Sequence, residues 1–261
     1  MSEEKSVVSE LVGQTSGVLE KAYDDLAHPT AKSVGNTVSL IPRTIGVWLG
    51  KWEKWVINGE ESIRLTAEAV REKAAKIPEE KLTEPEPYVA IPAVQQLSYC
   101  YDSEELRNMY ANLLVSSMNE DTKMNVHPGF TSIINQLSPL DVKVLEYIIS
   151  SGGAVTTVTM RLMFKNHSFM VPVTDYSIEL KEILDDTSLQ SATLQNLKRL
   201  GLVNISYDRY LKPVERYEAY LIDSVYLEQE RNAVEGKHIE LVKGFVELSA
   251  FGIAFCNVCC D

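Results

Sequence analysis

The closing segment "CNVCC" holds the side chains with the most evident capacity for chemistry. Cys256 and Cys259 have the CxxC spacing found in zinc and redox sites, and Cys260 follows directly. A tetrahedral zinc site would need a fourth ligand, for which Cys100 and His238 are the candidates. Thiols on an apolar terminal helix more often serve as buried packing groups. We therefore expect thiols here, and no metal site.

Familiar catalytic spacings do not occur elsewhere in the sequence. The four histidines are scattered, and none has the spacing of a metalloprotease or a zinc finger. The chain contains no phosphate-binding loop, dinucleotide fingerprint or serine-nucleophile elbow. Its 37 Asp and Glu residues could conceal a catalytic carboxylate pair. We predict a protein that is not an enzyme, with no cofactor and no identified small-molecule substrate.

The stretch "DSEELRNMYANLLVSSMN" places polar groups on an amphipathic helix. Asp102 is a good N-cap, and Glu105 can complete a capping box. Arg107 lies at the edge of the apolar face, where its stem can cover apolar surface while its guanidinium bonds outside the helix. Asn112 falls on the polar side. These groups either form a site or fix the helix to a neighbouring segment, and buried polar groups usually have such structural partners.

Helical periodicity dominates the N-terminal part of the chain. Apolar residues recur every three or four positions over residues 5–27 and 43–77, which predicts two helices. The second helix carries Trp48, Trp52 and Trp55 in its first turns. Such a stripe is usually core facing other helices, and the alternative is a face for a protein partner or for self-association.

Prolines and caps organise the segments that follow. Four prolines in residues 76–92 predict an extended connector, with a short helix at 93–101. Further on, Ser138 and Asp141 should cap a helix that ends at Ser150.

The C-terminal part alternates between helix and strand patterns. Ser188–Leu200 is expected to form a capped helix closed by Gly201. Strands are expected at 202–207, 217–222 and 238–249, and a last helix closes the chain. Helices followed by a recognition-like helix and a β-hairpin are the layout of a winged helix.

We therefore predict a mainly α chain, in which an N-terminal helical domain precedes a winged-helix-like α+β C-terminal domain. The expected parts are a long-helix region at 1–77, a proline-rich connector with a central helical domain at 78–137, and the winged-helix-like domain at 138–261.

Charge bears on the possible partners. The formal net charge is −12 and the pI is about 4.9, so indiscriminate binding to phosphate backbones is disfavoured. Residues 138–261 hold 12 Lys and Arg against 17 Asp and Glu, a net charge of −5. A DNA-binding alternative would use Lys198, Arg199 and Arg209, which is a sparse set for a DNA reader. Contacts with proteins are favoured.

The sequence predicts a cytoplasmic protein without a membrane span. The N-terminus "MSEEKSVVSE" is acidic and has no apolar core of signal-peptide length. The most apolar stretch, residues 33–50, is interrupted by Pro42 and Arg43, and a span needs roughly 20 apolar residues. Membrane contact through 33–50 is kept as an alternative.

Four segments of the chain resemble the Abi-alpha family of bacterial proteins. They are "KIPEEKLTEPEPYVAIPAVQQLSY", "SEELRNMYANLLVSSM", "VHPGFTSIINQLSPLDVKVLEYI" and "GFVELSAFGIAFCNVC". The proline connector, the Arg-containing helix, the H-P-x-F segment and the L-S-P-x-D segment follow the family's order and spacing. The resemblance covers most of the chain, and the first 75 residues match mainly in helical character.

The resemblance implies a role in abortive infection, in which an infected bacterium stops growing or dies before a phage can multiply. It supplies no catalytic residues. It also holds the Arg-containing helix and the H-P-x-F segment together, which implies that Arg107 and Asn112 bond to backbone around His127, Pro128 and Phe130. We expect these five residues to form a structural pin.

Three functional hypotheses follow. The first is a non-enzymatic phage-defence protein that contacts a protein partner or forms a homo-oligomer. The second is a winged-helix DNA-binding regulator that reads DNA with Ser188–Leu200. The third is a membrane-acting toxic effector that exposes residues 33–50.

Overall fold

A computed structural model of the chain describes residues 60–97, 100, 103–234 and 236–260. These residues fall into two compact units. The first takes in the described residues before Ser103 together with Tyr110–Thr131. The second takes in Ser103–Met109 and the described residues from Ser132 onward. The three expected parts of the chain, with boundaries at 77 and 137, stay a prediction.

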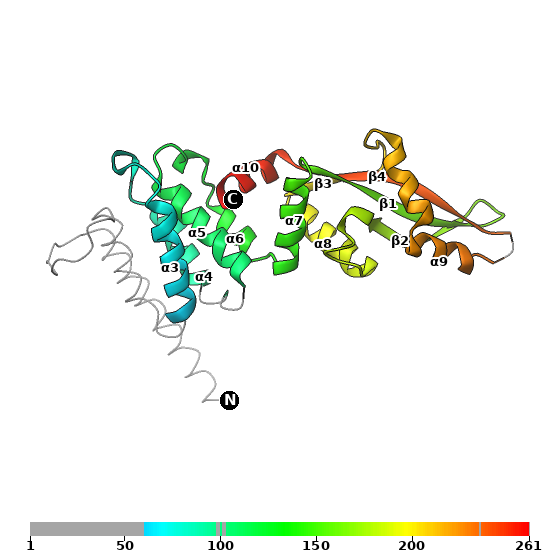
Figure 1. Cartoon of the computed structure of the whole chain (residues 1–261), viewed down its shortest axis with the longest axis horizontal. Helices are drawn as coiled ribbons and strands as arrows, with labels where there is room; N and C mark the ends of the chain where they lie inside the picture. Colours follow the sequence, from blue (N-terminus) through cyan, green and yellow to red (C-terminus); the bar gives the residue numbers. More distant parts are fainter. Residues whose placement is uncertain (1–59, 98–99, 101–102, 235, 261) are drawn as a thin grey trace, which may run out of the picture. The chain divides into compact units, whose positions relative to one another are not determined.

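The described chain up to Ile134 is mainly helical (Figure 1). Its helices are α3 (Glu60–Ala74), the 3-10 helix η1 (Glu79–Lys81), α4 (Pro87–Leu97), α5 (Glu104–Met118), the 3-10 helix η2 (Lys123–Asn125) and α6 (Gly129–Ile134). Parts of α5 and α6 belong to the second unit. The helix predicted over residues 43–77 is confirmed for α3, and its earlier part lies outside the described residues.

The predicted connector is wrong in its last residues, because α4 already begins at Pro87. Proline suits the first position of a helix, since its fixed φ is helical and its missing N–H would have had no partner there. Burial then keeps the segment helical despite the internal Pro92, because one apolar face is covered. The buried residues of α4 are Val89, Ala90, Ala93, Val94 and Leu97.

Backbone pairing ties the segment after η1 to the end of α5. The N–H of Thr83 donates to the carbonyl of Met118 at 2.8 Å, and the N–H of Glu120 donates to the carbonyl of Lys81 at 2.9 Å. The Lys81 ammonium also lies 2.6 Å from the Asp121 carboxylate. These contacts form a short antiparallel pairing between the segment after η1 and the residues that follow α5.

The second unit is an α+β assembly around one sheet (Figure 1). Its elements are α7 (Pro139–Ser150), β1 (Ala154–Met163), β2 (Phe169–Tyr176), η3 (Ile178–Leu180), α8 (Thr187–Arg199), β3 (Val203–Ser206), η4 (Val214–Ile222), α9 (Ser224–Asn232), β4 (His238–Leu248) and α10 (Ala250–Cys259), where η marks a 3-10 helix.

Helix caps fix where the helices of this unit begin. Ser138 and Asp141 form a reciprocal capping box at the start of α7, as the sequence predicts. Asp186 caps α8 by accepting the N–H of Leu189 at 2.8 Å. The first helical turn of α10 is capped by Ser249. The helices predicted at α7, at Ser188–Leu200 and at the end of the chain are thus confirmed within a residue or two.

All strand pairs are antiparallel, and the sheet order is β2-β1-β4-β3. The long β1–β4 ladder runs from the Ala154–Glu247 pair to the Met163–His238 pair. Strand β1 is rich in Val and Thr, whose branched side chains fit a pleated surface. The strands predicted at 202–207 and 238–249 are confirmed as β3 and β4, whereas the β1–β2 hairpin was not predicted.

The strand predicted at 217–222 is wrong, because this segment belongs to η4. A 3-10 helix has three residues per turn, so Tyr217 and Tyr220 project from the same side. Both rings are buried against the sheet. They join a cluster of buried residues that comprises Val158, Met160, Val173, Tyr176, Tyr217, Tyr220 and Ile239. Burial of two tyrosines at a spacing of three therefore overrides the strand-like composition of the segment.

We predict that Gly252→Ala lowers the free energy of unfolding by about 1–3 kcal/mol. A Cβ at Gly252 would collide with the carbonyl oxygen of Leu202, where α10 approaches the turn before β3. The shift in denaturation midpoint can be measured by circular dichroism. Ile253→Ala is the control, since Ile253 is exposed on the same helix and its loss should change stability by less than about 0.5 kcal/mol. Equal stability of Gly252→Ala and wild type would contradict this packing.

Candidate functional site

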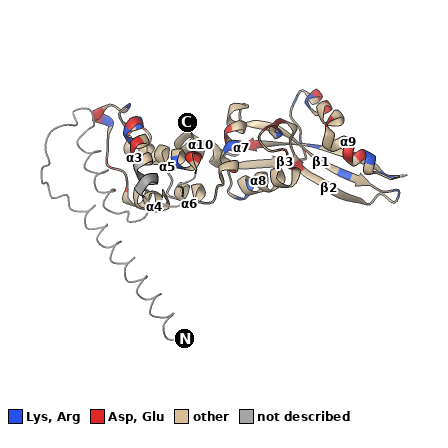
Figure 2. Ribbon diagram, turned by 60° about the horizontal axis from the view of Figure 1, so that its bottom comes forward, with Lys and Arg blue, Asp and Glu red and all other residues tan. Residues whose placement is uncertain are grey.

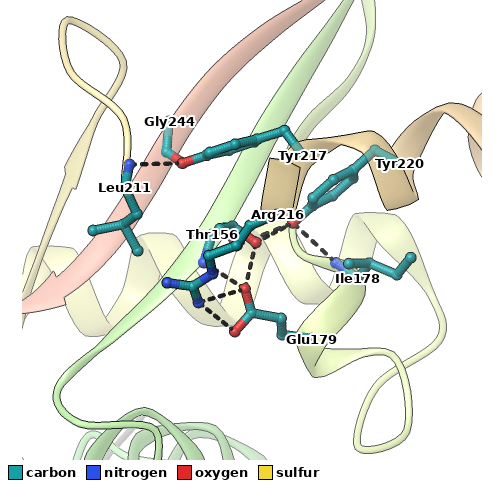
Figure 3. A network of polar contacts seen from close by, with 8 residues as sticks. All are labelled: Thr156, Ile178, Glu179, Leu211, Arg216, Tyr217, Tyr220 and Gly244. Carbon is teal, nitrogen blue, oxygen red and sulfur yellow. Dashed lines mark hydrogen bonds and ion pairs between the residues drawn. The ribbon is translucent and has the colours of Figure 1, made fainter. Parts of the chain in front are cut away.

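A network of polar side chains lies where η3 and η4 meet β1 (Figure 3). Its centre is the Glu179 carboxylate, which follows β2 in the chain. The Thr156 N–H donates to Glu179 Oε1 at 3.0 Å, and the Thr156 hydroxyl donates to the same oxygen. Arg216 Nη2 reaches both carboxylate oxygens, at 3.0 and 3.1 Å. One carboxylate thus links three segments that are far apart in sequence.

Two tyrosines of η4 extend this network into the core (Figure 3). The Tyr220 hydroxyl lies 2.8 Å from Thr156 Oγ1 and accepts the N–H of Ile178 at 3.2 Å. The Tyr217 hydroxyl donates to the carbonyl of Gly244 in β4 at 2.7 Å and accepts the N–H of Leu211 at 3.1 Å. The rings bury apolar area while their hydroxyls satisfy backbone groups. The two tyrosines therefore fix η4 both to the sheet and to η3.

A second carboxylate, that of the buried Asp175, joins β2 to α8. Asp175 sits at a β-bulge with φ of +53°. Its carboxylate accepts hydrogen bonds from the Tyr207 hydroxyl at 2.7 Å, from Gln195 at 2.8 Å and from Ser191 at 3.2 Å. A buried carboxylate needs such donors. The bulge turns the side chain away from the regular ladder and toward these donors.

A third carboxylate, Asp223, caps α9. Its Oδ1 accepts the N–H of Val225 at 2.9 Å and the Tyr176 hydroxyl at 2.8 Å, and its Oδ2 lies 2.7 Å from Lys181 Nζ. Burial opposes ionisation of Asp223, but the Lys181 ammonium and the Val225 N–H outweigh it and lower the pKa of the carboxyl. Asp223 therefore ties α9 to β2 and to the segment after η3.

Together these contacts position the irregular segments of the second unit on its sheet. The oxygens of all three carboxylates accept hydrogen bonds from the protein's own hydroxyl, amide, guanidinium and ammonium groups. Each carboxylate therefore holds one element against the sheet. Among the described residues, no group of three or more His, Cys, Asp or Glu side chains is arranged to hold a metal ion.

Burial strongly perturbs the tyrosines of these networks. It raises the pKa of Tyr220 to about 12, and it also raises the pKa of Tyr207 to about 12. The pKa of Tyr176 is raised further, first by burial and then by its hydrogen bond to the Asp223 carboxylate. These hydroxyls therefore stay protonated at neutral pH and serve as neutral hydrogen-bond donors.

The predicted pin residues lie around α5 and α6. Asn112 and Phe130 are buried, Arg107 is half-buried, and His127 and Pro128 are exposed. His127 Nδ1 accepts the N–H of Gly129 at 3.0 Å, and the His127 ring lies 5.8 Å from that of Phe130. Bonds from Arg107 and Asn112 to this turn stay a prediction.

A contact that was not predicted joins α5 to α6. The buried Tyr110 hydroxyl donates to the carbonyl oxygen of Thr131 at 3.4 Å. In the sequence Tyr110 stands on the apolar face of its helix, which gave no reason to expect a polar role. At the start of α5 the Ser103 hydroxyl accepts the N–H of Leu106 at 3.2 Å, and the predicted cap Asp102 lies outside the described residues.

The residues of the alternative hypotheses are placed only in part. Trp48, Trp52 and Trp55, and the stretch 33–50, lie outside the described residues. Arg199 is exposed on α8, where its guanidinium donates to Gln136 at 3.0 Å and to Asn196 at 2.8 Å. Lys198 is exposed on the same helix.

The third candidate DNA contact, Arg209, lies in the loop after β3. It is exposed, and its guanidinium stands over the Phe245 ring at 5.4 Å. Both Arg209 and Arg199 thus contact neighbours within their own unit. No described helix is long and apolar enough to cross a bilayer.

The terminal cysteines are thiols, as are all four cysteines of the chain. Cys256 and Cys259 are buried in α10, and Cys260 is half-buried. A hydrogen bond between Cys256 and Cys260 lowers the pKa of Cys256 and raises that of Cys260. Burial raises the pKa of the Cys259 thiol. The predicted packing role of this segment agrees with that burial.

We predict that Glu179→Gln lowers the free energy of unfolding by about 2–3 kcal/mol, because the half-buried Arg216 guanidinium loses its counter-charge. Chemical denaturation followed by circular dichroism measures the change. Glu182→Gln is the matched control, since Glu182 is exposed three residues later and its substitution should change stability by less than about 0.5 kcal/mol. Similar effects of the two substitutions would show that Glu179 does not organise this region.

We also predict a loss of stability in alkali, between about pH 10 and pH 12. In this range the unfolded chain loses tyrosine protons that the folded chain retains on Tyr207 and Tyr220, so the free energy of unfolding falls as pH rises. The slope should be about 1.4 kcal/mol per pH unit for each tyrosine. Denaturant unfolding at a series of pH values measures it. Tyr220→Phe should remove one tyrosine's share of the slope, and an unchanged slope would rule out its raised pKa.

Comparisons with known proteins identify the family of the chain. No curated protein is significantly similar to the chain. Among solved structures, the chain resembles an uncharacterized protein from the hydrocarbon-degrading marine bacterium Alcanivorax borkumensis SK2. The identity is 15% and the TM-score 0.34, over 53% of this chain and 94% of that one. The family model described as "Abortive infection alpha" matches residues 58–259, which include α3 to α10. The chain therefore belongs to the Abi-alpha family, as its sequence motifs predicted.

Proposed function

We propose that this protein acts in abortive infection without catalysing a reaction, through contacts with another protein or with a second copy of itself. Membership of the Abortive infection alpha family supports a role of this type. The contact mechanism is supported by an exposed apolar surface on the second unit, formed by η4 and α9. We call it the η4–α9 face and define it by Leu221, Ile222 and Leu227.

This face carries the proposal because its apolar side chains lack cover in the described chain. Ile222 is 79% exposed, Leu221 46% and Leu227 42%. None of the residues of α9 is buried, although the helix has nine residues. Single exposed apolar residues are ordinary on protein surfaces, but three on adjoining elements form a patch. Covering that patch with another protein surface would remove its apolar area from water.

Polar groups border the apolar side chains. A hollow of about 490 Å³ beside Leu227 is lined by Ser224, Glu230 and Arg231 as well. Figure 2 shows acidic and basic residues together on α9. An apolar centre with a polar rim of both signs is the usual composition of a protein interface. A nucleic acid would instead require a surface of one positive sign.

The polar networks beneath the face supply rigidity. Asp223 links the start of α9 to Tyr176 and Lys181, and Glu179 links η4 to β1 through Arg216. A surface held in this way loses little conformational entropy when it binds. The carboxylates of Asp223 and Glu179 thus support binding by holding α9 and η4 in fixed positions on the sheet.

The winged-helix interpretation of the second unit stays part of the proposal. It is supported by α8, which directly precedes β3, and by the antiparallel pairing of β3 with β4. The β1–β2 hairpin before α8, and the insertion of η4 and α9 between β3 and β4, depart from the simple layout. The insertion is the part that carries the η4–α9 face.

The test is a phage challenge at low and high ratios of phage to cells. Cells carrying the wild-type gene should survive at the low ratio and still collapse at the high ratio, because infected cells are lost before phage multiply. The double variant Ile222→Asp with Leu227→Asp should lose this protection, since two buried carboxylates would oppose any apolar contact. Met124→Asp is the control, because Met124 is 87% exposed in the first unit.

The possible outcomes test the role in phage defence separately from the use of the η4–α9 face. Loss of protection in the double variant alone, with all proteins equally stable, would support both. Protection by the double variant would place the contacts elsewhere on the protein. Equal plaque counts with and without the wild-type gene, over a broad phage panel, would contradict the role in defence.

A further inference from the structure

The far end of the sheet combines apolar and basic side chains in a way that the proposed function does not use. We call it the sheet tip and define it by the segments 161–171 and 234–238, of which residue 235 lies outside the described residues. Met163 pairs with His238, and the Lys165 side chain lies against Gly236, so the β1–β2 turn and the start of β4 adjoin. Figure 1 shows both at the same end of the sheet, away from α10.

Apolar side chains are unusually exposed at this tip. Met170 is 62% exposed, Val234 61%, Phe169 49% and Val171 47%. Three of them are consecutive in β2, which is an edge strand of the sheet. Because consecutive side chains of a strand point to opposite faces, Phe169 and Met170 expose apolar surface on both faces of the tip. Exposed apolar surface rimmed by polar groups marks an interaction site.

Basic residues surround these side chains. The Arg161 guanidinium stands over the Phe169 ring at 4.7 Å, and the Lys237 ammonium stands over the Phe164 ring at 4.8 Å. Lys165 is exposed in the turn. Within the sequence of the tip, three Lys or Arg oppose one Glu, a formal charge of +2, so the remainder of the chain has a formal charge of −14.

An ion pair engages Arg161 at the tip, and Lys165 and Lys237 supply the remaining positive charge. Arg161 Nη1 lies 3.7 Å from Glu240 Oε2, across β1 and β4. Lys165 and Lys237 belong to the two adjoining turns, where the ammonium groups can turn toward a bound anion. Positive charge is thus concentrated beside the exposed apolar groups of a strongly acidic protein.

We infer that the sheet tip binds the surface of an anionic lipid bilayer. Met170, Val171, Phe169 and Val234 would enter the boundary between headgroups and acyl chains, while Lys165 and Lys237 contact lipid phosphates. Charge complementarity directs this end of an otherwise acidic molecule toward the membrane. The tip lies on the surface and does not cross the bilayer.

A nucleic acid fits the same surface less well. Binding of single strands depends on aromatic rings that stack on bases, together with a basic groove. Three of the four exposed apolar side chains are Met or Val, which offer no ring. The rings of Phe164 and Phe169 already have cations over a face. The composition therefore favours lipid.

The test measures binding of the full chain to two kinds of vesicle by co-sedimentation. One kind contains about one third phosphatidylglycerol in phosphatidylcholine, and the other is phosphatidylcholine alone. We expect binding to the anionic vesicles only. Lys165→Gln with Lys237→Gln should weaken it about 25-fold, from about fivefold per lysine. Lys198→Gln with Lys212→Gln, exposed lysines outside the tip, makes the same charge change and should leave binding within about twofold of wild type.

A second variant tests the apolar contribution. Met170→Asp should weaken binding to anionic vesicles at least about 10-fold, because a carboxylate cannot enter the apolar boundary. Met124→Asp adds the same charge in the first unit and should weaken binding by less than about twofold. Both methionines are well exposed, and thermal unfolding verifies that the variants remain folded.

Three results would overturn the inference. They are an absence of binding to the anionic vesicles, equal effects of the tip and control variants, and binding to a fluorescent oligothymidylate that the tip lysines support while vesicles stay unbound. The last would identify a nucleic-acid surface instead. The vesicle assay needs no phage, so its failure leaves the proposed role in defence untouched, and failure of the phage challenge leaves membrane binding untouched.

Discussion

A carboxylate withdrawn from water must be surrounded by hydrogen-bond donors, and the second unit is organised by three such groups. Glu179 draws β1 and η4 together, Asp175 draws α8 onto β2, and Asp223 sets the start of α9. Each carboxylate acts at a place where the chain leaves the regular ladder. The sheet supplies the frame, and these contacts decide where the irregular segments lie on it.

The surfaces that we connect with function depend on this arrangement. The η4–α9 face exists because Tyr217 and Tyr220 turn inward at a spacing of three, which leaves Leu221 and Ile222 outside. The sheet tip exists because β1 and β4 extend beyond the part of the sheet that η4 covers, as Figure 1 shows. One surface is mainly apolar with a mixed rim, and the other is apolar with a basic rim. Their chemistry suits different partners.

Signals between residues close in sequence predicted most helices and strands. Contacts between residues far apart in sequence could not be predicted. The capping box of Ser138 and Asp141 and the terminating Gly201 lie next to the helices they bound, so α7 and α8 were found from sequence. The N-cap of α8, Asp186, lies two residues before the predicted start of that helix. The network of Glu179, Thr156 and Arg216 joins residues 23 and 37 positions apart, and no spacing rule reports such pairs. The segment at 217–222 is rich in Tyr, Leu and Ile, as strands often are, and only the packing of its tyrosines shows that it is a 3-10 helix.

The pairing of β1 with β4 has a consequence for how the chain folds. These strands are adjacent in the sheet, yet β2, α8, β3, η4 and α9 all separate them in sequence. On the ribosome, the β1–β2 hairpin emerges long before β4, and one edge of β1 then has no neighbour to pair with. Contacts between distant segments also slow folding, because long loops must close first. The second unit is therefore completed only after β4 has emerged, and until then the unpaired edge of β1 is open to association with other chains.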